Sequence, residues 1–449
     1  MPGRAGHARA VVVLQNMLDM LVLAAPEWFS AALLRLSFLN QGVIDFVIWP
    51  LVQIAILLFV VATAVAYLVY VERKISAFIQ ARLGPMRVGP FGLLQPLADL
   101  VKLISKEDFI PDKADRLIFP LAPMISVLAA FTVLSVLPFG PVWLHISDVN
   151  IGLLFVLAFS SVGVLGIIMA GWSSNSKYPL LGGLRSSAQL VSYEVGMGLA
   201  IVGALMFTGT LSMVGIIDEQ AQSGVWNIFY QPLGFFIFLV CGLAETNRTP
   251  FDLPEGESEI VGGFHTEYSG FRWSLFFLSE YTAMVIVSSV ATTLYLGGWH
   301  FWGVARLIDP AKMPALYALV GLAIFVAKVL VLVYIFMWFR WTFPRYRYDQ
   351  LMDLGWKWLT PAALGNIVLT GIVYVVVKDV LGFDFTNAAN RPAKFALFLG
   401  MLIVATPVVL AIVAWINKQG EMMNIGEQRR RQVLARAARQ ARIAEQKAG

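Results

Sequence analysis

The stretch "VIWPLVQIAILLFVVATAVAYLVY" (Val47–Tyr70) contains no charged side chain over 24 residues. A helix of that length rises about 36 Å, which exceeds the roughly 30 Å hydrocarbon core of a bilayer. Comparable apolar runs recur along the chain, and the fifth is the weakest because its start could lie nearer residue 226. The sequence predicts nine membrane spans, near 47–70, 118–138, 151–171, 189–209, 231–244, 273–296, 315–339, 361–378 and 394–417.

Composition supports the same fold class. Of the 449 residues, 58% are hydrophobic and 14% are charged, and the mean hydropathy is +0.74. Soluble domains carry about 25% charged residues. We therefore predict an all-α, polytopic helical membrane protein with about nine transmembrane helices and additional amphipathic interfacial helices. The single cysteine, Cys241, excludes a disulfide framework or a cysteine-bound iron–sulfur cluster within the chain.

The two ends of the chain differ from the apolar middle. Residues 1–45 form an N-terminal extension whose segments 10–25 and 27–39 we interpret as surface or interfacial helices, although a tenth span within 10–39 stays open. The transmembrane domain is placed at 46–418. Residues 419–449 are predicted to form a basic cytoplasmic helix, which either lies by anionic headgroups or docks a partner subunit.

Lysine and arginine indicate the orientation. With the N-terminus outside and nine alternating spans, the inner segments hold 24 of the 33 cations and the outer segments hold 8, with Lys328 inside the seventh span. This asymmetry predicts a cytoplasmic C-terminus by the positive-inside rule. All long polar loops then lie on the cytoplasmic side.

One of these loops is unusually acidic. "AETNRTPFDLPEGESEIVGGFHTEYSG" (Ala244–Gly270), here called the acidic loop, carries six carboxylates and the single cation Arg248. Acids after Pro254 suit a helix start, which explains about two of them. Because close carboxylates cannot all ionise cheaply, some of them should hold protons near neutrality. The loop is therefore a candidate proton path, and divalent-cation binding is an alternative without a fitting ligand spacing.

Another loop mixes cations with apolar residues. "YVERKISAFIQARLGPMRVGPFGLLQPLADLVKLISKEDFIPDKADR" (Tyr70–Arg116), here called the first loop, contains two Gly-Pro turns and then a segment that is apolar on one helical face. It is interpreted either as an interfacial helix with headgroup-pairing cations or as one wall of a site for an amphiphilic ligand.

Three charged residues fall inside predicted spans, away from the span ends: Glu194, Glu280 and Lys328. A carboxylate at membrane depth costs several kcal/mol unless it is paired, neutralised or hydrated. Each glutamate is therefore either a proton-carrying group facing a polar cavity or one half of an ion pair between helices. Lys328 should have a buried partner.

The loops carry long motifs. They are "VERK" (71–74), "GP..VGP.GLLQPLAD..KL..KE" (84–107), "GW.SNSKY.LLG.LR" (171–185), "SYEV" (192–195), "AETNR.PFDLPE.ESE.V.G.HTEYSG" (244–270) and "PRYRYDQLM.LGWK" (344–357). Over roughly residues 45–380 the chain resembles the family of H subunits of the bacterial proton-translocating NADH:quinone oxidoreductase, respiratory complex I. The ninth span, and Gly256 in place of the usual alanine, depart from the family pattern.

The resemblance implies a function in a multi-subunit translocase of the bacterial inner (plasma) membrane. Quinone, whether ubiquinone or menaquinone, is the substrate, and it binds where this chain meets other subunits. NADH is oxidised on another chain, so no complete active site and no catalytic residue lie here. The family holds no flavin, iron–sulfur cluster or metal in this subunit. The implied partners are the peripheral-arm quinone-site subunits, the neighbouring antiporter-like and small membrane subunits, and lipids, with no nucleic acid.

The resemblance also assigns site residues. The quinone-chamber positions are Arg73, Lys74, Arg82, Asp99 and Phe271. The proton-coupling positions are Glu194, Glu245, Asp252, Glu255, Glu257, Glu259, Glu267 and Glu280. The expected function is to couple quinone reduction by NADH-derived electrons to proton translocation. The alternatives are the homologous membrane subunit of a proton-pumping membrane-bound hydrogenase-type complex, a stand-alone transporter, for which no internal repeat is seen, and a structural anchor.

Overall fold

A computed structural model describes residues 47–141, 146–254, 256–301, 313–376, 400–412, 414, 415 and 418. Throughout this part of the chain the secondary structure is helical and no strand occurs. The predictions for the N-terminal extension (1–45) and for the basic tail (419–449) lie outside the described residues, as do the outer parts of the ninth predicted span.

The described helices fall into two groups along the chain, before the acidic loop and from it onward. Those before the acidic loop are α4 (Trp49–Ile79), η2 (Pro90–Gly92), α5 (Gln95–Ser105), α6 (Ile118–Leu134), α7 (Gly152–Ser173), α8 (Lys177–Thr208), α9 (Met213–Ser223), α10 (Asn227–Tyr230) and α11 (Pro232–Glu245). Those within and after it are α12 (Glu257–Ile260), η3 (Gly263–His265), α13 (Gly270–Tyr295), α15 (Pro314–Thr342), α16 (Tyr348–Asp353), η4 (Leu354–Leu359) and α17 (Thr360–Val375).

Among the described residues, six helical stretches are long and apolar enough to cross a membrane. They are 49–79, 152–173, 177–208, 270–295, 315–342 and 348–375, and shorter apolar helices occupy 118–134, 232–245 and 400–412. The predicted all-α, polytopic membrane protein is thus confirmed. Three helical stretches extend well beyond the predicted spans: α4 runs on to Ile79, α8 already begins at Lys177, and the stretch that ends with α17 begins at Tyr348. The "VERK" motif is therefore helical.

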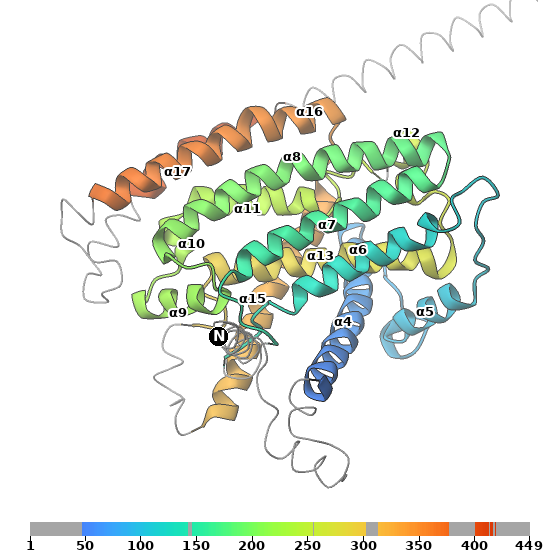
Figure 1. Cartoon of the computed structure of the whole chain (residues 1–449), viewed down its shortest axis with the longest axis horizontal. Helices are drawn as coiled ribbons and strands as arrows, with labels where there is room; N and C mark the ends of the chain where they lie inside the picture. Colours follow the sequence, from blue (N-terminus) through green and yellow to red (C-terminus); the bar gives the residue numbers. More distant parts are fainter. Residues whose placement is uncertain are drawn as a thin grey trace, which may run out of the picture.

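Long helix α8 occupies the centre of the bundle. It packs against α7, α11 and α17 along its length, while α13 packs against α6 and α15 (Figure 1). Small residues allow the closest approach: a Cβ on Gly171 of α7 would stand 2.6 Å from the Pro179 carbonyl oxygen and 3.2 Å from Gly183 Cα, both on α8. Such glycine contacts are a common means of helix packing where lipid offers no hydrophobic drive.

Two sets of buried or partly buried polar side chains connect helices of the bundle. Gln231 accepts a hydrogen bond from Asn366 (2.7 Å) and donates one to Thr370 (2.6 Å), which ties α17 to the start of α11. Lys328 of α15 donates to three carbonyl oxygens that follow α13, those of Leu296, Gly298 and His300, at 2.6–2.8 Å. The expected buried partner of Lys328 is therefore backbone rather than a carboxylate.

The first loop and the acidic loop pack together at one end of the bundle, here called the loop end. The Ser269 hydroxyl of the acidic loop donates to the Glu107 carbonyl oxygen of the first loop at 3.5 Å, and Tyr268 of the acidic loop stacks on Phe119, at the start of α6, with ring centroids 4.0 Å apart. Arg272 pairs with Asp108 at 3.0 Å. The loops therefore form one folded surface rather than separate connections, and functional side chains from distant parts of the sequence meet there.

Candidate functional site

A buried ion-pair network lies at the centre of the loop end. Glu72 of α4 is only 3% exposed. Its Oε2 accepts hydrogen bonds from Arg248 Nη1 and from the Tyr281 hydroxyl, both at 2.7 Å, and its Oε1 accepts one from Arg340. These groups come from α4, the acidic loop, α13 and α15. The Glu72 carboxylate thus joins four segments that are as much as 268 residues apart in sequence.

Arg248 extends the network into α13. Its Nε donates to Glu280 Oε1 at 2.9 Å, and its guanidinium stands 3.7 Å from the centre of the Tyr281 ring. Two arginines thereby face two glutamates, so the formal charges balance. Charge-assisted hydrogen bonds and the cation–π contact offset the large cost of removing these ions from water. One amino group, Nη2, is buried without a hydrogen-bond partner among the described residues.

The local fold of the acidic loop aims Arg248 inward. The chain turns after α11 with Asn247 in the left-handed region (φ 51°), and Phe251 N donates to Arg248 O at 2.8 Å. Gln189 of α8 donates to the carbonyl oxygens of both Ala244 (2.8 Å) and Phe251 (2.7 Å). One amide side chain therefore holds the two arms of the turn together, and Arg248 projects from between them.

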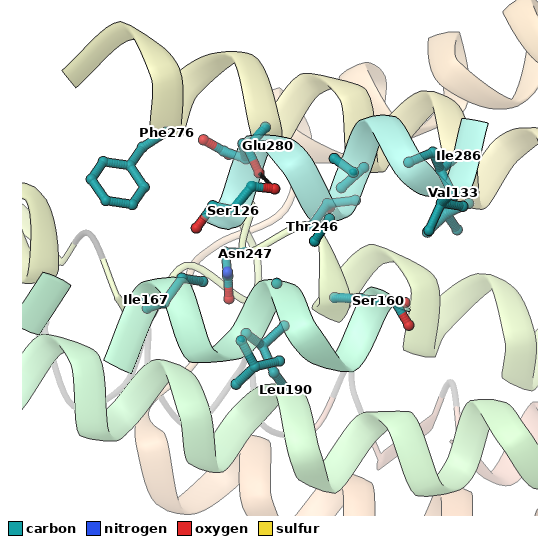
Figure 2. Close-up of a pocket in the computed structure, with 18 of the residues that line it drawn as sticks. Ser126, Val133, Ser160, Ile167, Leu190, Thr246, Asn247, Phe276, Glu280 and Ile286 are labelled. Atoms are coloured by element: carbon teal, nitrogen blue, oxygen red, sulfur yellow. Dashed lines mark hydrogen bonds between the residues drawn. The ribbon is translucent and has the colours of Figure 1, made fainter. Parts of the chain in front are cut away.

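A cavity of about 120 Å³ adjoins Glu280. It is lined from α6, α7, α8, α11, the acidic loop and α13, and three glutamates contribute to its wall: Glu194, Glu245 and Glu280. Figure 2 shows Glu280 on α13 beside Ser126 on α6, with Leu190 of α8 on the opposite wall. A cavity of this size with carboxylate and hydroxyl groups has room for several water molecules.

The other two cavity glutamates contact neutral groups. Glu194 accepts a hydrogen bond from the Ser161 hydroxyl. Glu245 Oε2 is buried and has no hydrogen-bond partner among the described residues. An oxygen in this position can accept a bond from a water in the cavity. The cavity wall thus includes Glu194 and Glu245, and Glu280 contributes both to that wall and to the Arg248 network.

Four of the five residues predicted for the quinone chamber lie in the first loop, which includes the end of α4, and the fifth lies in α13. Arg73 pairs with Asp99 of α5 at 2.6 Å. Lys74 Nζ approaches Met86 Sδ at 3.0 Å, and Arg82 donates to Gln80 at 2.6 Å. Phe271, at the start of α13, is 47% exposed.

The remaining predicted acids lie apart from the cavity wall. Glu259 is half-exposed and pairs with Arg185 of α8 at 2.7 Å, and this hydrogen bond, together with nearby Arg345 and Arg347, holds the pKa of Glu259 below its ordinary value. Asp252 is close enough to influence the charge of Glu280, and Glu267 is half-buried before α13. Glu255 lies outside the described residues, as does the side chain of Glu257.

Sequence reasoning missed part of this site. Glu72, Tyr281 and Arg340 were not predicted, and Arg248 was noted only as the lone cation of its loop. The available signals were weak: Glu72 is an acid on the continuation of an apolar helix, and Tyr281 directly follows Glu280. No local pattern pairs residues that are 176, 209 and 268 positions apart.

Comparisons with known proteins bear on this geometry. The family model described as NADH dehydrogenase matches residues 52–371. The chain belongs to the NADH dehydrogenase family. It is 48% identical to the NADH-quinone oxidoreductase H subunit 1 of Koribacter versatilis over 400 aligned residues, which cover 75% of this chain and 94% of that protein. The stated resemblance is thereby confirmed.

Two further relatives also have names that identify them as H subunits of an NADH-quinone oxidoreductase. The NADH-quinone oxidoreductase H subunit 1 of Geobacter metallireducens is 50% identical (73% of this chain, 96% of that protein), and the H subunit 2 of Rhizobium meliloti is 47% identical (72% and 99%). The residues matched by the NADH dehydrogenase family include the whole ion-pair network and the cavity. The apolar helix at 400–412 lies beyond them.

The network yields a stability prediction. Arg248→Gln removes one cation from between two buried carboxylates, and breaking a buried pair in this way costs about 3–5 kcal/mol. We expect far less folded chain in membranes and a lower melting temperature in detergent. Lys357→Gln is the control, because its pair with Asp353 is 68% and 49% exposed and should contribute at most about 1 kcal/mol. Equal stability of the two variants would show that the buried pairs do not stabilise the loop end.

His265 yields a pH prediction. Burial beside the Phe264 and Trp273 rings lowers the pKa of His265 from 6.5 to about 4. Between these values the unfolded chain binds a proton that the folded chain does not. Stability from this group is therefore complete above pH 6.5 and is lost as pH falls toward 4, by about 1.4 kcal/mol per pH unit.

His265→Gln should flatten that loss of stability. The measurement is the thermal midpoint of the protein in detergent between pH 8 and pH 4, for both proteins. If the thermal midpoints of the wild type and the variant fall in parallel as the pH decreases, His265 is not the group whose protonation destabilises the fold.

Proposed function

We propose that this chain is the membrane subunit of an NADH:quinone oxidoreductase that forms part of the quinone chamber and couples quinone reduction to proton translocation. The supporting observation is the adjacency of Glu72 and Arg73 on α4. Arg73 faces the first loop and pairs with Asp99, whereas Glu72 faces inward and binds Arg248. The proposed chamber wall and the buried ion-pair network are therefore only one residue apart along α4.

The chemistry requires such a connection. Reduction of a quinone to a quinol consumes two electrons and two protons. In this proposal the electrons come from NADH through other chains. Charge that develops beside Arg73 and Asp99 acts on Glu72 and Arg248 through a protein interior in which ionic interactions are strong.

The ion-pair network offers a way to couple this change in charge to proton transfer. Arg248 binds Glu72 and Glu280 at once, so a change at one carboxylate alters the stabilisation of the other. Glu280 also lines the cavity with Glu194 and Glu245. We propose that protons pass among these carboxylates through cavity water, with Asp252, Glu255, Glu257, Glu259 and Glu267 of the acidic loop forming the connection to the aqueous side.

Other subunits complete the site. No residue here is assigned a catalytic role, and the quinone head group is proposed to bind where the first loop meets the peripheral arm. Helix α5 presents exposed apolar residues to such a partner or to the membrane surface, among them Leu97, Val101 and Ile104. In this arrangement the loop end faces the cytoplasm of a bacterial inner membrane, with the N-terminus outside.

The enzyme assignment can be tested with the intact complex. A tag on this chain would recover the complex from native membranes, and the assay would measure NADH-driven reduction of a short-chain quinone with and without a quinone-site inhibitor. Inhibitor-sensitive activity is expected. A complex that ignores NADH and quinone but evolves or consumes hydrogen would instead assign the chain to the hydrogenase branch.

The coupling role generates a mutational prediction. Glu280→Gln preserves side-chain volume and a hydrogen-bond acceptor for Arg248 but cannot exchange a proton. We expect the rate of inhibitor-sensitive quinone reduction to fall about tenfold, equivalent to about 1.4 kcal/mol of activation free energy, or the number of protons moved per NADH to fall. Glu257→Gln should act in the same direction.

Asp353→Asn is the matched control for these variants, because this carboxylate lies in an exposed pair with Lys357. It should leave both readouts unchanged. If the assembled Glu280→Gln or Glu257→Gln complex keeps the full rate of quinone reduction and the full number of protons moved per NADH, that glutamate is not part of the proton pathway.

A further inference from the structure

Two consecutive serines of α7 bring their hydroxyl groups to one backbone carbonyl oxygen. The Ser160 hydroxyl lies 2.9 Å from Leu157 O, and the Ser161 hydroxyl lies 3.0 Å from the same oxygen. A backbone carbonyl oxygen has two lone pairs, and within an α-helix one of them accepts the amide N–H four residues later, here that of Ser161. One lone pair of Leu157 O therefore remains for two hydroxyl donors.

Each of these serines has a second acceptor, and in both cases it is a glutamate. The Ser161 hydroxyl donates to Glu194 Oε1 of α8. Ser160 lies beside Glu245, the last residue of α11, close enough for a side-chain hydrogen bond to its carboxylate. A hydroxyl group has one proton and donates it to one acceptor at a time. Each serine can therefore serve either Leu157 O or its glutamate, but not both.

The two serines lie on different sides of α7. Ser160 lines the cavity, in a part of its wall well away from Phe276 (Figure 2). Ser161 is exposed on the outer side of the helix and reaches Glu194 from there. A substitution at position 161 can therefore change the hydrogen bonding of Glu194 while the lining of the cavity by α7 stays the same.

The structure shows one of two arrangements that satisfy this count of donors and acceptors. Ser160 donates to Leu157 O, Ser161 donates to Glu194, and Glu245 Oε2 is buried without a hydrogen-bond partner among the described residues. An ionised carboxylate accepts hydrogen bonds, whereas a protonated one donates its own proton, for which water in the cavity is a suitable acceptor. This arrangement therefore suits an ionised Glu194 and a protonated Glu245.

The second arrangement reverses these roles. Ser160 donates to an ionised Glu245, Ser161 turns to Leu157 O, and a protonated Glu194 donates to the Ser161 oxygen. Between the two arrangements one proton leaves Glu245 and one proton reaches Glu194 through cavity water, so the total charge is unchanged. Each serine keeps its own proton and only rotates about its Cα–Cβ bond.

We propose that Ser160 and Ser161 are positioning residues that make Glu194 and Glu245 exchange one proton, because the two hydroxyls compete for Leu157 O. The proposal rests on the proposed function, in which protons pass among the cavity carboxylates, and it identifies what keeps two of them in opposite protonation states. Both arrangements contain the same kinds of hydrogen bond, so neither traps the proton. A donor fixed on one glutamate would instead hold the negative charge there.

Ser161→Thr and Ser161→Val form a matched pair of variants that differ by the hydroxyl group and have nearly the same shape. Both place a branched side chain at an exposed position, so a steric effect would be common to the two. With rates expressed per assembled complex, Ser161→Val should lower kcat for inhibitor-sensitive quinone reduction about tenfold, and Ser161→Thr should retain it within about twofold. The KM for a short-chain quinone should stay unchanged, because the serines do not contact the proposed quinone site.

Ser160→Ala tests the shared acceptor. Alone it should slow quinone reduction about as much as Ser161→Val does. Because the exchange fails as soon as either hydroxyl is missing, the double variant should be no slower than the slower single variant. Thr132→Val of α6 is the control, because the Thr132 hydroxyl donates to Leu128 O of its own helix at 2.7 Å. It should match the wild type.

Infrared difference spectroscopy of the intact complex adds a readout that a purely structural role would not change. When one carboxyl group loses a proton and another gains one, the C=O region should show two bands of opposite sign on quinone reduction. These bands should persist in Ser161→Thr and should be absent from Ser161→Val and Ser160→Ala.

Two results would overturn the exchange: equal rates and spectra for Ser161→Val and Ser161→Thr, or losses of the two single variants that multiply in the double variant. Failure of the proposed function is a different result, because inhibitor-sensitive quinone reduction would then be absent from the wild-type complex, or Glu194→Gln and Glu245→Gln would both keep full activity. Slow glutamate variants combined with serine variants like the wild type would overturn the exchange alone.

Discussion

The charge of a single buried guanidinium constrains the whole loop end. Arg248 is 2% exposed, and an ion in that position is tolerable only if carboxylates and a π face surround it. Glu72, Glu280 and Tyr281 meet this requirement, and they come from α4 and α13. The packing of these helices against the acidic loop therefore follows from the need to balance one charge away from water.

Polar groups elsewhere in the bundle are arranged differently. Lys328 is satisfied by three carbonyl oxygens, and Gln231 is joined to Asn366 and Thr370. Such contacts hold helices in place, and their hydrogen bonds involve no carboxylate. The ion-pair network and the adjoining cavity combine opposite charges, titratable carboxylates and space for water. This combination makes the loop end, rather than the other polar contacts, the place where coupling is proposed.

The sequence predicted the features that depend on local pattern. Apolar runs identify helices, and the density of acids singles out the loop that carries Arg248. The sequence could not predict the ion-pair network, because Glu72 finds its partners through tertiary contacts between segments that no periodicity connects. Nor could it predict that "VERK" is helical: the apolar run ends at Tyr70, yet α4 continues to Ile79 because its Glu72 face is buried in the protein. The positions of Ser160 beside Glu245 and of Ser161 beside Glu194 are likewise visible only in three dimensions.

The carboxylates around Arg248 and the cavity are proposed to change protonation when quinone is reduced. Infrared difference spectroscopy of the intact complex, in the region of the protonated carboxyl C=O stretch, measures this directly. We expect a band that appears or disappears on quinone reduction, shifts in D₂O, and is lost in a Glu245→Gln variant. An identical difference spectrum in the wild type and in that variant, or no carboxyl band at all, would contradict proton transfer through these carboxylates.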